Sequence, residues 1–111
     1  MINPNQKTIK NNATLSGFGI HTGVHTNLTF VPAKANTGIR FIRTDLEGKP
    51  TVPATVDYVF STNRSTNLKF KNFEIHTVEH VLAAIVAAGI DNIIIEVDNI
   101  EIPILDGSSI Q

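Results

Sequence analysis

The chain of 111 residues contains no cysteine and no tryptophan. The absence of cysteine excludes a disulfide framework and a thiolate metal site, and it is compatible with a reducing compartment. No apolar run approaches the roughly 18 residues that cross a membrane, and the opening sequence MINPNQK does not lead from basic residues into an apolar run. We therefore expect a cytoplasmic protein without a membrane span.

A strong net charge is also missing, because nine Lys and Arg residues stand against ten Asp and Glu residues. This balance argues against a general affinity for nucleic acid or for membrane surfaces. The hydrophobic share of 41% and the charged share of 17% are those of an ordinary globular protein. A chain of this length is large enough for one domain with its own core, so we expect a single domain over residues 1–111.

Most of the first 75 residues show the alternation of polar and apolar side chains that is typical of β-strands. The expected strands are 8–10, 14–20, 24–31, 38–44, 52–60, 65–70, 73–75 and 92–97. In the fourth of these, Ile39 and Phe41 are expected to face inward, with Ile42 as a further candidate, and Arg40 and Arg43 to face water. The last of them, NIIIEV, is apolar enough to predict a central strand of the sheet.

One convincing helix is expected over roughly 76–88, where an apolar run ends at Gly89, a residue suited to the position after a helix. Strands before and after one helix, without regular alternation, indicate an α+β two-layer sandwich with a mostly antiparallel sheet. Residues 103–109 have the character of a loop with cap residues for a second helix. We expect that second helix to be truncated, and further sequence of the same protein to lie downstream.

The start of the expected helix carries the sequence HTVEH at residues 76–80, with His76, Glu79 and His80 close together. Ionisable groups are costly to bury unless they are paired or bound to a metal, and imidazole and carboxylate are common zinc ligands. On a helix, His76 and His80 share one face, and H-x-x-E-H is the pattern of the inverted zinc peptidases. A third ligand would have to come from the acids Glu74, Glu96, Asp98, Glu101 and Asp106, none of which stands in a suitable helical context.

The alternative interpretation of this motif is structural. His76 then caps the start of the helix, Glu79 complements the helix dipole and His80 is a half-buried histidine with its own partners. In that case the chain is a non-catalytic interaction domain.

Three longer segments carry further information on function. They are LSGFGIHTG at 15–23, TVEHVLAA at 77–84 and EIPILDGSS at 101–109, and GIDN follows the expected helix at 89–92. In this order and at these separations, the chain resembles the UDP-3-O-acyl-N-acetylglucosamine deacetylases. These are zinc amidohydrolases of lipid A biosynthesis in Gram-negative bacteria. The resemblance runs from about residue 7 to residue 109. In some bacteria the family is fused to a 3-hydroxyacyl-carrier-protein dehydratase, and either form is open as the parent of this chain.

The resemblance implies the N-terminal half of a two-domain enzyme that removes the N-acetyl group from UDP-3-O-(3-hydroxyacyl)-N-acetylglucosamine. It implies that His80 binds Zn²⁺ and that Glu79 is the general base, and it gives His76 no part in the metal site. The other ligands, a histidine and an aspartate, are expected from the missing C-terminal domain of the same polypeptide, with the histidine that protonates the leaving amine. The chain alone is therefore expected to be inactive.

The resemblance also gives candidates for binding the UDP-linked acylated aminosugar. Ile20 and His21 correspond to residues that line the substrate cleft, and the glycines beside them would let the backbone approach a ligand closely; the alternative is a plain hairpin turn. In the sequence TNRST, which borders the site in the family, the candidates are Arg64 and Ser65. Arg64 either meets the diphosphate or pairs with an acid. Residues 106–109 are expected to form a cap and a turn.

Overall fold

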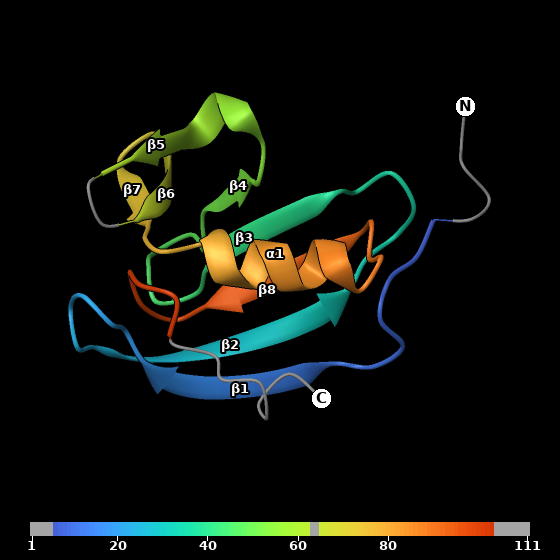
Figure 1. Ribbon diagram of the computed structural model, residues 1–111, viewed down its shortest axis with the longest axis horizontal. Coiled ribbons are helices and arrows are strands. Elements are labelled where there is room, and N and C mark those ends of the chain that lie inside the picture. The colour runs from blue at the N-terminus through green and yellow to red at the C-terminus, as the bar shows by residue number, and fades with distance from the viewer. Residues whose placement is uncertain (1–5, 63–64, 104–111) are drawn as a thin grey trace.

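The computed structural model describes residues 6–62 and 65–103, and it contains two sheets and one α-helix (Figure 1). The larger sheet has the strand order β1-β2-β8-β3-β4 and the smaller one β5-β6-β7. All described strand pairs are antiparallel except β3 with β8. The elements are β1 Ala13–Phe18, β2 His25–Pro32, β3 Ile39–Arg43, β4 Thr51–Pro53, the 3-10 helix η1 Val56–Tyr58, β5 Val59–Ser61, β6 Thr66–Phe70, β7 Phe73–Ile75, α1 Glu79–Ala87 and β8 Ile93–Val97. The expected α+β class with a mostly antiparallel sheet and one main helix is confirmed.

Strand β8 lies in the middle of the larger sheet, between β2 and β3. Ile93, Ile95 and Val97 alternate along it on one face and are buried. Helix α1 lies across this face of the sheet (Figure 1) and contributes Val81 and Ile85, one helical turn apart, to the same core. The prediction of a central apolar strand is therefore confirmed, and burial of each of these side chains stabilises the fold by about 1.5–3 kcal/mol.

The two ends of the helix differ in how well the sequence predicted them. Gly89 follows the helix with a φ of 74°, as expected for a glycine that terminates a helix. The helix begins at Glu79, however, and not at residue 76. His76 lies in extended backbone, where its N–H donates to Ile100 O at 2.7 Å and its carbonyl accepts from Ile102 N at 3.0 Å. The expectation that His76 and His80 share a helical face, or that His76 caps the helix, is therefore wrong.

The expectation for Arg43 is also wrong, because this side chain is buried. In a strand, residues two apart share a face, so Arg43 points to the same side as Phe41 while Arg40 points to the other. Its guanidinium donates to both carboxylate oxygens of Asp45, at 2.8 and 2.7 Å, and to Glu74 O at 2.8 Å. The hydrogen bonds and charge of Arg43 hold the pKa of Asp45 below its ordinary value despite partial burial.

Two other expected strands differ from the structure. Residues 52–60 do not form one strand, because the chain leaves the larger sheet after Pro53, turns through η1 and enters the smaller sheet as β5. Residues 8–10 are not a strand. The tight hairpin turn at Lys71 and Asn72 is confirmed, since Phe70 pairs with Phe73 across it.

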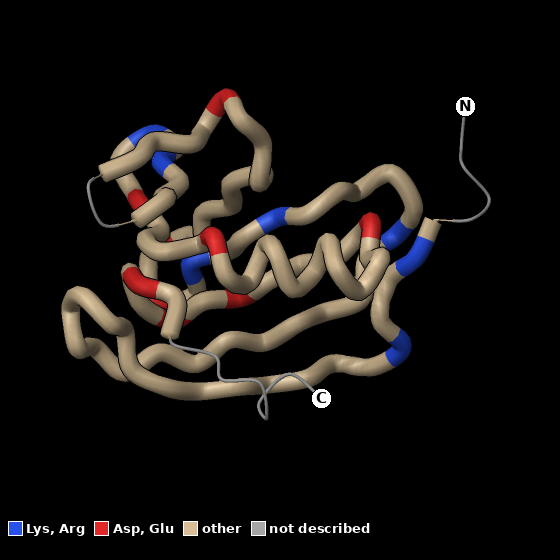
Figure 2. The backbone as a smooth tube through the Cα atoms, in the orientation of Figure 1, with Lys and Arg blue, Asp and Glu red and all other residues tan. Residues whose placement is uncertain are grey.

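Charged residues are unevenly spread over the fold (Figure 2). Acidic positions occur where β8 leads into residues 98–101, whereas the segment 7–10 at the opposite end of the sheet is basic. Across 6–62 and 65–103, no helix has the length and apolar character needed to cross a membrane.

Candidate functional site

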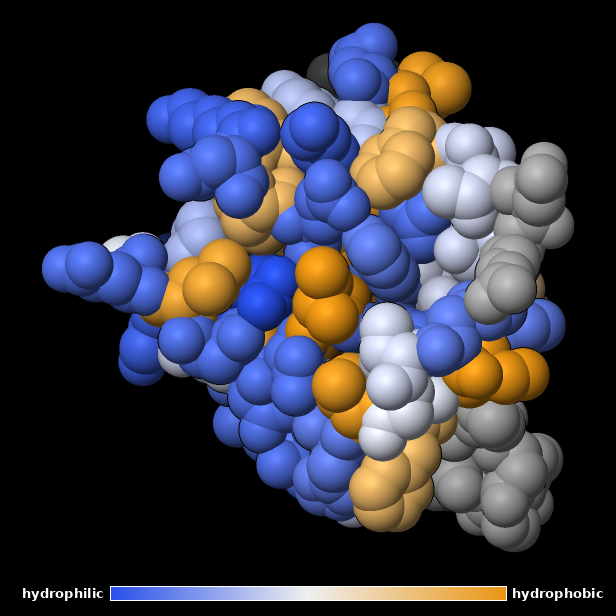
Figure 3. Space-filling model, turned by 90° about the vertical axis from the view of Figure 1, so that its left-hand side faces the viewer, coloured by the Kyte–Doolittle hydropathy of each residue, from blue (hydrophilic) through white to orange (hydrophobic). Residues whose placement is uncertain are grey.

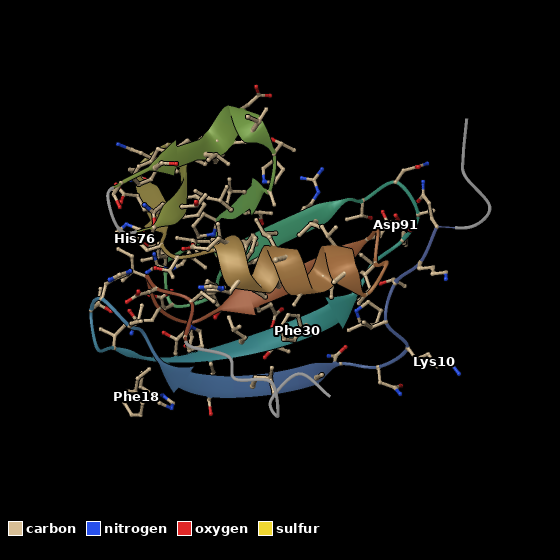
Figure 4. The ribbon with its side chains drawn as sticks, viewed as in Figure 1. Lys10, Phe18, Phe30, His76 and Asp91 are labelled. Carbon is tan, nitrogen blue, oxygen red and sulfur yellow. The ribbon has the colours of Figure 1, made fainter. Side chains whose placement is uncertain are left out.

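The described parts of the three segments that carry the family resemblance, which for the third segment are residues 101–103, come together at the N-terminal end of α1. In Figure 1 the turn between β1 and β2, the start of β6, the start of α1 and residues 98–103 all lie at the left-hand end of the molecule. Figure 3 faces this end and shows apolar side chains scattered among hydrophilic ones. The apolar side chains exposed in the β1–β2 connection include those of Phe18 and Ile20, each 62% exposed. Phe18 is labelled in Figure 4, at the tip of β1 and away from the helix.

Glu79 is the first residue of α1, and Thr66 holds it in place from the neighbouring strand β6. The N–H of Thr66 donates to Glu79 Oε1 at 3.3 Å, and the carbonyl of Thr66 accepts from Val78 N at 2.9 Å. The carboxylate is half-buried and stands in the first turn of the helix, where the helix dipole favours a negative charge. Thus Glu79 is oriented while part of its surface stays open to a ligand.

The two histidines of the motif have different surroundings. His80 is exposed, and its side chain has no hydrogen bond or ion pair within the described part of the chain, so its ring is available to a ligand. The ring of His76, labelled in Figure 4, lies with Nε2 2.6 Å from Glu74 Oε1 and edge-on to Phe60. His76 is therefore already paired, and the peptidase interpretation loses its second histidine ligand.

These positions offer few of the donors that a zinc ion needs. His80 suits one zinc ligand, with Glu79 beside it, but a metal site needs at least three ligands from the protein. No group of three or more His, Asp or Glu side chains within 6–62 and 65–103 stands close enough to hold a metal ion. The described residues thus fit one ligand of a zinc site and do not complete the set.

The candidate substrate-binding residues lie at this same end of the molecule as far as they are described. His21 and Ile20 are exposed in the turn between β1 and β2. Ser65 immediately precedes β6, and its hydroxyl donates to Asn67 Oδ1 at 2.9 Å. Arg64 lies outside the described residues, and so does the expected cap at 106–109.

Sequence reasoning did not identify Glu101 as a site residue, although the structure places it at the centre of this region. Its side chain is fully buried. Oε1 accepts hydrogen bonds from the N–H and the hydroxyl of Thr22, at 2.8 and 2.7 Å. Oε2 accepts from His21 N at 3.1 Å and from the hydroxyl of Thr77 at 2.8 Å. The carboxylate thus joins the β1–β2 turn to the residues before the helix.

The ionisation of Glu101 follows from these contacts. Burial by itself would raise the pKa of Glu101, because it disfavours the charged form. The hydrogen bonds donated by Thr22, Thr77 and His21 stabilise the carboxylate more than burial destabilises it, and they hold the pKa below its ordinary value. Glu101 is therefore a buried anion at neutral pH.

Thr77 and Asn67 complete the network. Thr77 has a φ of 64°, a left-handed conformation that costs a residue other than glycine about 1–2 kcal/mol. Its N–H donates to Asn67 Oδ1 at 2.9 Å, and Asn67 also accepts from the hydroxyl of Ser65. Strained backbone held by several contacts is common at functional sites. In the sequence, the one indication that Thr77 and Glu101 belong to the site was that each is the first residue of a segment that carries the resemblance.

Comparison with known proteins identifies the family of the chain. The family model of the UDP-3-O-acyl N-acetylglycosamine deacetylases, LpxC, matches residues 6–111. The chain belongs to this family. It is 47% identical over 94% of its length to the UDP-3-O-acyl-N-acetylglucosamine deacetylase of Thermosynechococcus vestitus, where the match covers 36% of the relative. It is 49% identical over 94% of its length to the bifunctional enzyme LpxC/FabZ of Bacteroides thetaiotaomicron, covering 23% of that protein.

The LpxC relatives therefore confirm the resemblance, and they include both the separate deacetylase and the bifunctional form. A third relative, the deacetylase of Psychrobacter sp., is 46% identical over 94% of the chain, and the match covers 35% of that enzyme. The chain spans about a third or less of the length of these three relatives.

Proposed function

We propose that this chain supplies one half of the active site of a zinc-dependent deacetylase in lipid A biosynthesis. The substrate is UDP-3-O-(3-hydroxyacyl)-N-acetylglucosamine, and hydrolysis of its N-acetyl group releases acetate and a free glucosamine amine. The observation that carries the proposal is the juxtaposition of an oriented Glu79 and an unpaired, exposed His80 at the start of α1, in a chain that belongs to the LpxC family.

In this proposal Glu79 is the general base and His80 is a zinc ligand. Consecutive residues of a helix project about 100° apart, so one side chain can bind the metal while the other reaches a water molecule beside it. A zinc ion held by His80 and by ligands from outside the described residues would activate water and polarise the amide carbonyl. Glu79 accepts the proton of the attacking water, and the contact with Thr66 N keeps its carboxylate directed to that task.

The remaining parts of the site follow from their positions. Ile20 and His21 are exposed on the β1–β2 turn and are proposed to contact the substrate. Arg64 and Ser65 are proposed to do so from the segment before β6, with Arg64 supplying positive charge for the diphosphate. The other zinc ligands and the acid that protonates the amine are proposed to come from a further domain of the same polypeptide. The cytoplasmic location stays a prediction.

The test is a hybrid enzyme in which residues 6–111 replace the matched segment of the Thermosynechococcus vestitus deacetylase. We expect it to contain zinc and to release acetate from the UDP-linked substrate, whereas the 111-residue chain alone releases none. In the hybrid, Glu79→Gln should lower kcat by about 100-fold or more while leaving zinc content unchanged, since general bases typically contribute that much. His80→Ala should lower both zinc content and kcat.

His76→Gln is the matched control, because it alters the other histidine of the motif and should change neither quantity. A folded, zinc-containing hybrid that releases no acetate would contradict the proposal. Full activity in Glu79→Gln would leave the helix motif with a structural role only, as an interaction domain would have.

A further inference from the structure

Glu101 connects two segments that are distant in the sequence and that both carry residues of the proposed site. One carboxylate receives hydrogen bonds from His21 and Thr22, some 80 residues earlier in the chain, and from Thr77, 24 residues earlier. The first segment carries Ile20 and His21 themselves. The second leads within two residues to Glu79. Glu101 is thus the shared anchor of both halves of the site that this chain contributes.

The β1–β2 turn packs closely against the carboxylate of Glu101. Gly19 is buried and lies directly against Glu101, and a Cβ added to Gly19 would overlap the carboxylate. The turn itself is closed by Gly23 N, which donates to Gly19 O at 3.0 Å. The glycine therefore allows the backbone to approach an internal carboxylate, where the sequence had suggested approach to a ligand.

On the side of the helix, the anchor holds a strained residue. Thr77 keeps its left-handed φ of 64° while its hydroxyl is bound to Glu101 and its N–H to Asn67. Loss of either contact removes part of what maintains that conformation. Since α1 begins two residues later, a change at Thr77 reorients the first turn, on which Glu79 and His80 stand.

We propose that Glu101 is a positioning residue of the deacetylase, whose carboxylate fixes the β1–β2 turn relative to the start of α1. This inference rests on the proposed function. Glu101 does not itself meet the reacting atoms; it acts on substrate binding through Thr22 and on the general base through Thr77. A displacement of about 1 Å at a reacting group can cost about 100-fold in rate, so loosening this anchor affects catalysis as well as stability.

The chain offers a matched set of variants for the test. Thr77→Val and Thr22→Val each remove one hydroxyl that donates to the carboxylate of Glu101 and keep the shape of the side chain. Thr26→Val is the control, because the buried hydroxyl of Thr26 donates at 2.8 Å to the main-chain carbonyl of Glu101 and not to its carboxylate. Thr77→Ser retains the hydroxyl and is the conservative variant.

The experiment measures kcat, KM and the folded fraction of the hybrid enzyme at one pH. We expect Thr77→Val to lower kcat by about 10-fold or more with little change in KM, and Thr77→Ser to restore most of that loss. Thr22→Val should instead raise KM several-fold, because it frees the turn that carries Ile20 and His21. Thr26→Val should lower stability alone, with kcat and KM per folded molecule unchanged.

A second experiment uses the same variants of the 111-residue chain. It compares the NMR chemical shifts of the backbone amides of Glu79, His80, His21 and Thr22 with those of the unaltered chain. Thr77→Val should shift all four, whereas Thr26→Val should leave those of Glu79 and His80 in place. If Thr77→Val and Thr22→Val lose activity in an active hybrid only in proportion to their folded fraction, as the control Thr26→Val should, the positioning role is overturned. If the folded, zinc-containing hybrid is inactive, the proposed function fails. The amide shifts then test the anchor separately, and shifts confined to Thr77 and its neighbours in the sequence would overturn it.

Discussion

At its C-terminal end, α1 is terminated by Gly89, which reaches a φ of 74° without strain and has open space where a Cβ would stand. At its N-terminal end, the chain reaches the helix through Thr77, whose φ of 64° is nearly the same. Here the residue is β-branched, and its conformation is maintained by Asn67 and by the buried carboxylate of Glu101. One end is set by a local preference of glycine, and the other by contacts between distant parts of the chain.

The two ends therefore differ in backbone strain, which is found at Thr77, next to the proposed site, and not at Gly89. A glycine at position 77 would adopt this backbone more easily, but it would have no hydroxyl for Glu101 to bind. The threonine couples the helix start to the β1–β2 turn, and this coupling brings Glu79 and His21 to the same end of the molecule. Strain at one end of the helix is thus associated with the proposed site, and the relaxed end is not.

The largest effect is expected from Glu101→Leu, which removes the anchor at the strained end. The replacement removes the acceptor of His21 N, Thr22 N and two hydroxyl groups. The hydroxyl of Thr77 is left buried without a partner, whereas the groups of the exposed turn can bind water, so the free energy of unfolding should fall by about 3 kcal/mol. Urea unfolding of the 111-residue chain measures this. Glu101→Gln retains one acceptor oxygen and should cost clearly less; equal losses in the two variants would mean that the hydrogen bonds do not matter.

Gly19→Ala tests the same anchor from the side of the turn. The added methyl group would overlap the carboxylate of Glu101, so either the turn or the carboxylate must move, and the expected loss is about 1–3 kcal/mol of unfolding free energy. Gly48→Ala is a suitable reference, because Gly48 is exposed and has open space around it. Gly48 has a φ of 77°, so its own loss reports backbone strain alone. Gly19 has no positive φ, so a loss at this position reports the overlap with Glu101, and the absence of a loss there would contradict the close fit.

A pH titration sharpens the comparison further. The pKa of Glu101 is lowered in the folded chain, so its carboxylate contributes stability that is present above the ordinary pKa of about 4.3. That contribution is lost as the pH falls through the lower pKa of the folded state. The difference in unfolding free energy between the unaltered chain and Glu101→Gln should therefore be constant from pH 7 to about pH 5 and decrease below it. Asp45 is present in both proteins, so its own lowered pKa cancels in the comparison.

The smallest effect is expected at the relaxed end of the helix. Gly89→Ala places a Cβ at a φ of 74° without any steric overlap, so the cost should be close to the intrinsic penalty of about 1 kcal/mol. Thermal or urea unfolding measures it. The amide resonances of Glu79 and His80 should be unchanged, and a shift there would show that the two ends of the helix are not independent.

The features that the sequence predicted correctly depend on short-range chemistry. Gly89 terminates the helix because of its own backbone freedom, and the hairpin at Lys71 and Asn72 follows from turn residues between two strands. The apolar alternation of residues 93–97 was sufficient to place β8 in the centre of the sheet. In each case the relevant signal lies within a few residues.

The features that were missed depend on distant partners. The helix starts at Glu79 because the backbone of His76 pairs with residues 100 and 102 and Val78 pairs with Thr66. The charge of the buried Arg43 is compensated by Asp45, which is two residues away, and by the carbonyl of Glu74 in β7; only this second partner is distant in the sequence. For the site, the family motif pointed to Glu79 and His80, whose roles stay proposals. The role of Glu101 was not visible in the sequence, since its partners lie 24 to 80 residues away.

The most direct test of the central claim is the kcat of the hybrid enzyme carrying Glu79→Gln, measured beside His76→Gln. The two residues lie three apart in one motif, but only Glu79 belongs to the helix and is open to a ligand, whereas His76 is paired with Glu74. We predict a loss of about 100-fold or more for Glu79→Gln, with zinc retained, and no loss for His76→Gln. Comparable kcat values for the two variants would contradict the assignment of the chemistry to the start of α1.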